Sequence, residues 1–149
     1  MAEESADSKA EKKEDVPLLS VHTTSLPLLL DQLGISVLVS TYQAGKVIVA
    51  RSEGGSVNTH FRDFKVPMGM ALSGNRLAIG TKNHVWEYQN QPDVAPKLAK
   101  AAREHDACYL PRASHLTGHI QIHEMAYAGP ELWIVNTRFS CLCTLAPDC

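Results

Sequence analysis

Residues 66–88, VPMGMALSGNRLAIGTKNHVWEY, decide the fold of this chain. A short apolar run, MGMALS, is followed by a turn at Gly74-Asn75 and a second run, RLAIGT. Lys82-Asn83 then leads into a third run, HVWEY. Short apolar runs separated by Gly and Asn at regular intervals are typical of an antiparallel meander. We therefore expect three consecutive strands here.

The same pattern occurs on both sides of this stretch. Upstream, ISVLVSTY, KVIVAR and SVNTHFRDF form a similar meander, and GISVLVST aligns with GNRLAIGT at an offset of 40 residues. Downstream, MAYAGPELWIVNTR aligns with MALSGNRLAIGTK if Pro130 is treated as an insertion, which places Thr137 on Thr81. KVIVA, HVWEY and CLCTL would then be equivalent strands.

A repeat of about 40 residues, each a small antiparallel meander, is typical of a β-propeller blade. We predict an all-β fold, a partial propeller of about two and a half blades, within a domain over residues 17–149. The blades lie near residues 35–65, 67–117 and 120–149, with an excursion at 89–112 in which KLAKAAREH forms a short helix. Because a closed propeller needs at least four blades, we expect a fragment whose partners include the missing blades of a longer parent chain.

The N-terminal region is expected to differ from the rest. Nine of the first fifteen residues are charged, so residues 1–16 are predicted to be a disordered tail. The following SLPLLLDQLG has leucines at helical spacing, with Ser25 as a possible N-cap, Pro27 in the first turn and Gly34 at the end. A short helix is therefore expected before the first strand.

Composition excludes several classes of protein. The chain has 149 residues and a net charge of −2, so no basic field indicates nucleic-acid binding. No apolar run is long enough to span a membrane, and the N-terminus has no secretory h-region. We therefore expect a cytoplasmic protein. Its four cysteines include Cys141 and Cys143, which a strand would place on one face as free thiols.

Six motifs carry a resemblance to a known family. They are STYQAGKVIVA, NTHFRDF, PMGMAL, HDACYLPR, HLTGHIQIHEMAYAG and LWIVNTRFSCLCTL. Over residues 20–146 the chain closely resembles the N-terminal half of a bacterial family of conserved hypothetical proteins. The resemblance implies a β-propeller, sometimes beside tetratricopeptide repeats, with no established biochemical function. The chain has His119 where the family usually has Asp, and Cys143 where it usually has a small residue.

The first candidate site is His115, His119 and His123 with Glu124, in HLTGHIQIHE. One helix would stack the three imidazoles on one face and favour a metal. Gly118 and the β-branched IQI instead indicate a turn and a strand, on which His119 and His123 would lie about 13 Å apart. His123 could still bind a metal or ligand at the central channel. Alternatively, His123 packs between blades and Glu124 anchors a loop.

The second candidate site is a ring of polar turns. The turn holding Asn136, Thr137, Arg138 and Ser140 has the same blade position as the turns at Tyr42-Gln43 and Lys82-Asn83. An Arg side chain can bind a carboxylate, phosphate or sulfate through two hydrogen bonds. Alternatively, Asn136 and Thr137 satisfy backbone groups of the turn, and Arg138 pairs with a neighbouring acid.

The third candidate is HDACYLPR, which brings His105, Asp106, Cys108 and Arg112 together in sequence. A Cys near His and Asp could be a thiol nucleophile. Cys108 lies in a run that reads as a strand, however, and closeness in sequence does not establish catalytic geometry. We expect Asp106 and Arg112 to contribute to a ligand-binding surface instead.

Two classes of function remain. The preferred one is a binding or scaffolding propeller for a small molecule or a protein of unknown identity, because none of the candidates has the specificity of a known catalytic motif. The alternative is an enzyme with an active site at the channel mouth, with or without a divalent metal. That site would use His123, Glu124, Asn136 and Arg138. The sequence does not indicate a cofactor.

Overall fold

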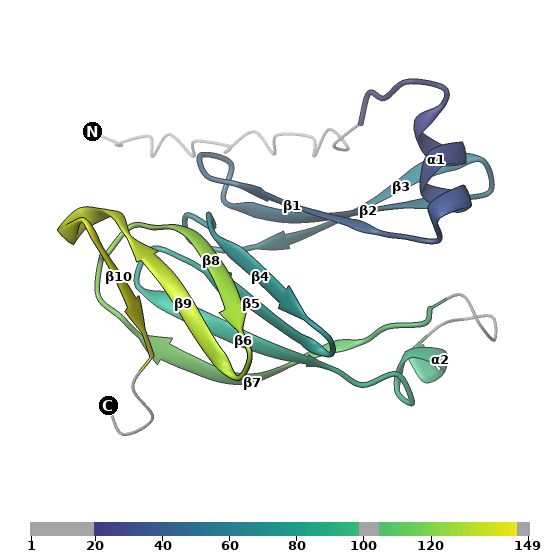
Figure 1. Ribbon diagram of the computed structural model, residues 1–149. Coiled ribbons are helices and arrows are strands. Elements are labelled where there is room, and N and C mark those ends of the chain that lie inside the picture. Colours follow the sequence, from purple (N-terminus) through teal and green to yellow (C-terminus); the bar gives the residue numbers. More distant parts are fainter. Residues whose placement is uncertain (1–19, 99–104, 146–149) are drawn as a thin grey trace, which may run out of the picture.

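The computed structural model describes residues 20–98 and 105–145 (Figure 1). The expected tail and residues 99–104 of the expected KLAKAAREH helix lie outside the described part. The described residues form ten strands in three antiparallel sheets, so the predicted all-β class is confirmed.

We call the three sheets A, B and C in chain order. Sheet A has the strand order β1–β2–β3, sheet B the order β4–β5–β6–β7, and sheet C the order β8–β9–β10. The strands are β1 (Val37–Thr41), β2 (Lys46–Glu53), β3 (Ser56–Asp63), β4 (Met70–Ser73), β5 (Arg76–Gly80), β6 (His84–Asn90), β7 (Tyr109–Leu116), β8 (Ile122–Ala128), β9 (Glu131–Asn136) and β10 (Cys141–Thr144). The helices are α1 (Leu26–Leu33), α2 (Ala95–Leu98) and the 3-10 helix η1 (Thr137–Phe139).

Helix α1 confirms the helix expected before the first strand. It begins after Ser25 and ends at Gly34, which adopts a left-handed φ of 59°. Glycine has no side-chain penalty in this conformation, and the Gly34 N–H donates to Asp31 O at 3.1 Å. Pro27 and Leu30 are the buried residues of the helix.

Strand β5 is buried on both faces. Leu77 and Ile79 pack on the side of sheet A, with Val47, whereas Ala78 packs on the side of sheet C, with Ile134. Successive side chains of a strand point to opposite faces, and the four buried residues Leu77 to Gly80 are all apolar, with the polar Arg76 at the start of the strand. Leu77 and Ile79 therefore pack between two neighbouring sheets.

Sheets B and C approach each other most closely at two glycines. A Cβ on Gly80 would lie 2.6 Å from Ile122 Cγ2, and a Cβ on Gly69 would lie 3.0 Å from the Glu124 backbone. The Gly69 N–H also donates to Ile122 O at 3.0 Å. The contact between these sheets therefore depends on the absence of side chains at both positions.

A single arginine also links sheets B and C. Arg76 of β5 donates to Gly129 O at 2.8 Å and to Pro130 O at 3.0 Å, in the β8–β9 hairpin. Its guanidinium lies 4.2 Å from the ring centroid of Tyr127, within the range of a cation–π interaction.

Strand pairing corrects the alignment of the third repeat. Met70 pairs with Ile79 in sheet B, and Met125 pairs with Ile134 in sheet C. Ile134 therefore takes the place of Ile79, and Pro130 is not an insertion. It lies in a two-residue hairpin loop of the same length as the β4–β5 loop, and the extra length of the third repeat lies in the β9–β10 turn, where η1 forms.

The third sheet also begins later than its sequence indicates. The β-branched run IQI predicted a strand from Ile120, but β8 starts at Ile122. Gln121 adopts a positive φ of 53°, which interrupts an extended conformation. His119 therefore lies outside the strand that holds His123.

Each sheet packs on the next through equivalent positions. In each sheet, one cross-strand pair lies near the turn that joins the two paired strands. These equivalent pairs are Ser40–Val47 in sheet A, Gly80–Val85 in sheet B and Val135–Leu142 in sheet C. Ser40 Oγ donates to Met68 O at 2.6 Å, just before sheet B, and Gly80 contacts Ile122 at the start of sheet C. Sheet B therefore lies between sheets A and C (Figure 1).

The close approach at Gly80 generates a stability prediction. Gly80→Ala should destabilise the fold by about 1–3 kcal/mol, because the new methyl group overlaps a buried side chain. Ile122→Ala should itself cost about 2–5 kcal/mol, but it removes the overlapping atoms. In a double-mutant cycle followed by urea denaturation, Gly80→Ala should therefore cost less in the Ile122→Ala background. An equal cost in both backgrounds would contradict the close contact.

Candidate functional site

A cleft of about 1250 Å³ lies between sheets A and B. We call it the A–B cleft. Strands β2 and β3 line one wall and β5 and β6 the other, and residues from the end of α1, Gly34 among them, form part of its border. The segment just before β7 also contributes, through His105, Asp106 and Ala107.

The floor of the A–B cleft is apolar and aromatic. Leu77 and Ile79 are buried there, and Phe64, Trp86 and Tyr88 pack around them. The rings of Phe64 and Tyr88 meet edge to face with centroids 6.4 Å apart. Such a floor can receive an apolar or aromatic group of a ligand.

The wall formed by sheet A carries positive charge. His60 pairs with Val49 and Arg62 pairs with Val47, so both side chains share the face on which Val47 packs against sheet B. Arg51 lies on the same face of β2 and lines the cleft with them. Strand alternation therefore places two guanidinium groups and an imidazole in the cleft.

His105 joins this group from the connection between sheets. Arg51 Nη1 donates to His105 Nδ1 at 2.9 Å. Burial, followed by the charges of Arg62, Arg51 and His105, lowers the pKa of His60 below its usual value. Desolvation is thus the first cause of the lowered pKa, and the neighbouring positive charges add to it.

Acidic side chains line the cleft as well: Asp31, Asp63 and Asp106 equal in number the cations Arg51, Arg62 and Lys65. Asp63 also pairs with Lys46. Glu53 lies 3.8 Å from Arg51 in an exposed contact. Asp31 and Asp106 line the cleft without a salt bridge within the described residues.

The sequence-predicted residues of the third candidate are divided by the structure. Asp106 lines the A–B cleft, and His105 binds Arg51. Arg112 is exposed on β7 and does not line the cleft. Cys108 is buried, and its backbone N–H donates to Asn90 Oδ1 at 2.8 Å.

Two side chains of the second candidate site, those of Asn136 and Arg138, form hydrogen bonds to neighbouring residues of the chain. Asn136 Oδ1 accepts from Phe139 N at 3.2 Å and caps η1, while Arg138 Nη1 donates to His119 Nδ1 at 3.0 Å. Thr137 is exposed in η1, and Tyr42 and Gln43 are exposed in the β1–β2 turn. Asn136 therefore follows the turn-chemistry alternative, and Arg138 pairs with a histidine rather than an acid.

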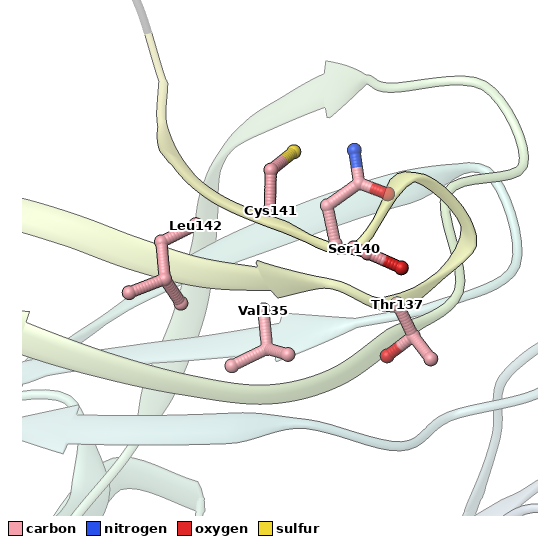
Figure 2. Close-up of a pocket in the computed structure, with 6 residues that line it drawn as sticks. Val135, Thr137, Ser140, Cys141 and Leu142 are labelled. Carbon is pink, nitrogen blue, oxygen red and sulfur yellow. The ribbon is translucent and has the colours of Figure 1, made fainter.

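A second, shallower pocket of about 320 Å³ lies beside this turn. Figure 2 shows its lining: Val135 and Leu142 point to one side of the β9–β10 hairpin and Cys141 to the other. Asn136, Thr137 and Ser140 complete it. Cys143 lies on the same side of β10 as Cys141. Burial is the main cause that raises the pKa of the Cys143 thiol, and the neighbouring Cys141 adds to it.

The three histidines of the first candidate have different environments. His115 Nε2 donates to Glu87 Oε1 at 2.8 Å, and His119 accepts from Arg138. His123 and Glu124 are exposed at an irregularity of the β8–β9 pairing, where Glu124 Oε1 accepts from Met125 N at 3.3 Å. Within residues 20–98 and 105–145, no group of three or more His, Cys, Asp or Glu is placed to hold a metal ion.

Sequence analysis missed the wall of the A–B cleft. Arg51, His60 and Arg62 alternate with other residues on two paired strands, in step with the buried Val47. This alternation is a signal that could have been used, since a charged residue in phase with a buried one shares its face.

Comparisons with known proteins add a family but no activity. A family model described as Domain of unknown function (DUF4915) matches residues 24–149. A search of the curated proteins finds no match. In the part of the chain that the structure describes, no helix is long and apolar enough to cross a membrane.

The electrostatics of the A–B cleft generate a second prediction. Arg62→Gln should raise the pKa of His60, because Arg62 is the arginine whose charge lowers that pKa more strongly. Arg51→Gln should raise it less. Two-dimensional NMR titration of the histidine side chains measures both changes. The control Lys97→Gln removes a positive charge from α2 and should leave His60 unchanged; an equal rise there would mean that only net charge matters.

Proposed function

Because the chain belongs to the family described as Domain of unknown function (DUF4915), whose description gives no activity, we propose a function from the site itself. The chain is a binding domain, and its A–B cleft takes a small organic anion with an apolar or aromatic body. The observation that carries this proposal is the convergence of Arg51, His60, Arg62 and His105 beside an apolar floor.

The two parts of the cleft match two parts of one ligand. Trp86 and Tyr88 offer aromatic surface on which a flat or apolar group can pack. Arg51 and Arg62 offer guanidinium groups, which bind carboxylate, phosphate or sulfonate groups through charge-assisted hydrogen bonds. Ligand pockets commonly combine a mostly apolar lining with a few polar groups that orient the ligand.

The enzyme alternative receives less support from the geometry. An active site built on Asn136 and Arg138 would require them to release Phe139 N and His119. His123 and Glu124 have exposed side chains, so they lack the enclosure that tunes catalytic groups. We therefore favour binding over catalysis.

A pair of fluorescent probes tests the proposal. Anilinonaphthalene sulfonate has an aromatic body and one negative charge, whereas N-phenylnaphthylamine has a similar body and no charge. In the double variant Arg51→Gln/Arg62→Gln, the affinity for the anionic probe should fall by roughly tenfold or more, because hydrogen bonds to charged groups are lost. Affinity for the neutral probe should remain within about twofold, since the aromatic floor is untouched.

Matched controls separate the site from net charge and from unfolding. The double variant Lys97→Gln/Arg112→Gln removes the same charge from residues that do not line the cleft, and should bind both probes as the original chain does. Circular dichroism should show unchanged structure in all variants. An unchanged affinity for the anionic probe in Arg51→Gln/Arg62→Gln would refute the proposal, as would an equal loss in the control.

A further inference from the structure

His60 lies between two arginines on the wall that sheet A contributes to the A–B cleft. On β3, Arg62 follows His60 by two residues and shares its face, about 6.6 Å away along the strand. On β2, Arg51 pairs with Asn58, which precedes His60 by two residues on that same face. The side chain of His60 is exposed in the cleft. An anion held between the two arginines therefore also lies beside this imidazole.

Histidines are the groups of the cleft whose charge changes near neutral pH. Carboxyl side chains ordinarily titrate near pH 4, and those of tyrosine, lysine and arginine at about pH 10 or above, whereas imidazole titrates near pH 6.5. A change of charge in the cleft between about pH 5 and pH 8 is therefore a change at its histidines. The histidines that line the cleft are His60, His84 and His105.

Two of these histidines have contacts with other side chains. Arg51 Nη1 donates to His105 Nδ1 at 2.9 Å, and a proton on that nitrogen would replace this bond by two opposed donors. His84 lies beside Trp86 on the wall formed by sheet B, with ring centroids 5.8 Å apart. Within residues 20–98 and 105–145, the side chain of His60 has no hydrogen-bond partner. Both of its ring nitrogens are therefore available to a ligand.

The surroundings of His60 favour its neutral form. Burial is the first cause that lowers its pKa, followed by the charges of Arg62, Arg51 and His105. Glu53 contacts Arg51 at 3.8 Å from the exposed end of β2. The other charged groups that line the cleft are Asp31 of α1, Asp63 of β3, Lys65 after β3 and Asp106 before β7. The carboxylates among them do not reverse the effect of desolvation and of the three basic side chains on His60.

An anion beside His60 would reverse this preference. A negative charge within about 4–6 Å favours the protonated form of an imidazole. Imidazolium has two N–H donors, whereas neutral imidazole has one, so protonation adds a charge-assisted hydrogen bond to the ligand. Because binding free energies are linked, the ligand strengthens proton binding by the same factor by which the proton strengthens ligand binding.

We propose that anion binding in the A–B cleft is coupled to protonation of His60, so that the domain takes up a proton with its ligand and holds the ligand more tightly as the pH falls. This proposal rests on the proposed function and adds the regulation of the same site by pH. The affinity is lowest above the pKa that His60 has in the complex. It rises as the pH falls toward the pKa of His60 in the unliganded domain, and it is constant below that value.

The affinity of the full chain for anilinonaphthalene sulfonate tests the coupling. The sulfonate stays ionised throughout this range, so any proton taken up on binding goes to the protein. Between about pH 8 and pH 5.5 the affinity should rise by roughly fivefold or more, since each unit by which the pKa of His60 rises corresponds to tenfold in affinity. Calorimetry in two buffers of different ionisation enthalpy should show proton uptake at about pH 6.5.

Variants and a second probe assign the effect to His60. His60→Gln should abolish both the proton uptake and the rise in affinity. His123→Gln is the matched control, because His123 is exposed on β8 and does not line the cleft, so this variant should keep both. The neutral probe N-phenylnaphthylamine should change in affinity by less than about twofold over the same range, since it has no charge to pair with an imidazolium. Circular dichroism at each pH establishes that the variants stay folded.

Two-dimensional NMR titration of the histidine side chains gives a direct measurement. Saturation with anilinonaphthalene sulfonate should raise the pKa of His60, and the size of that rise should account for the change in affinity. An unchanged pKa of His60 in the complex would overturn the proposal.

Three further results would overturn the coupling. They are an affinity of the original chain for the anionic probe that does not change with pH, a folded His60→Gln variant that keeps the change, and an equal change for the neutral probe. If the anionic probe still requires Arg51 and Arg62, any of these results leaves the proposed function standing. An affinity that is unchanged in Arg51→Gln/Arg62→Gln would instead remove both.

Discussion

The described part of the chain is organised by one strand that has no solvent-facing side. Strand β5 carries Leu77 and Ile79 toward sheet A, and Ala78 and Gly80 toward sheet C. The large residues form the floor of the A–B cleft on one side, and the small ones admit Ile122 on the other. Because packed interiors tolerate neither gaps nor overlaps, this alternation of size determines how close each neighbouring sheet can lie.

The A–B cleft follows from the same constraint at its other end. Near Val47 the two sheets are closed by apolar contacts. Toward Arg51 and His60, the inward positions of sheet A are polar, and burying a guanidinium without an anionic partner is costly. Arg51 meets Glu53 at 3.8 Å, and His60 and Arg62 keep exposed side chains in the cleft.

Local sequence signals predicted the elements well. Gly34 predicted the end of α1, and the alternating apolar runs predicted the three meanders, because turns and strand alternation depend on neighbouring residues. The predicted insertion at Pro130 was wrong, because an alignment of residue types does not show which residues pair across the β8–β9 hairpin. Gln121 ended the expected strand through its backbone conformation, which its residue type does not indicate.

The site was harder to predict than the fold, for a physical reason. A polar turn residue such as Asn136 is a natural candidate for a binding site when only the sequence is known. In the structure, its side chain instead caps the backbone of η1. Arg51, His60 and Arg62 lie in strands whose polar face looks solvent-directed until the position of sheet B is known. Which face of a strand points inward is a property of the whole arrangement rather than of the strand.

The order of the three sheets along the chain also has a consequence for how the protein acquires its structure. Each sheet is a meander of neighbouring segments, so its own contacts are local in sequence, and local contacts favour rapid folding. Each sheet then needs as a template only the sheet before it, as in other repeat architectures. During synthesis on the ribosome, sheet A can form and receive sheet B before sheet C has been translated. Within the described residues, assembly of the three sheets can therefore proceed in the order of translation.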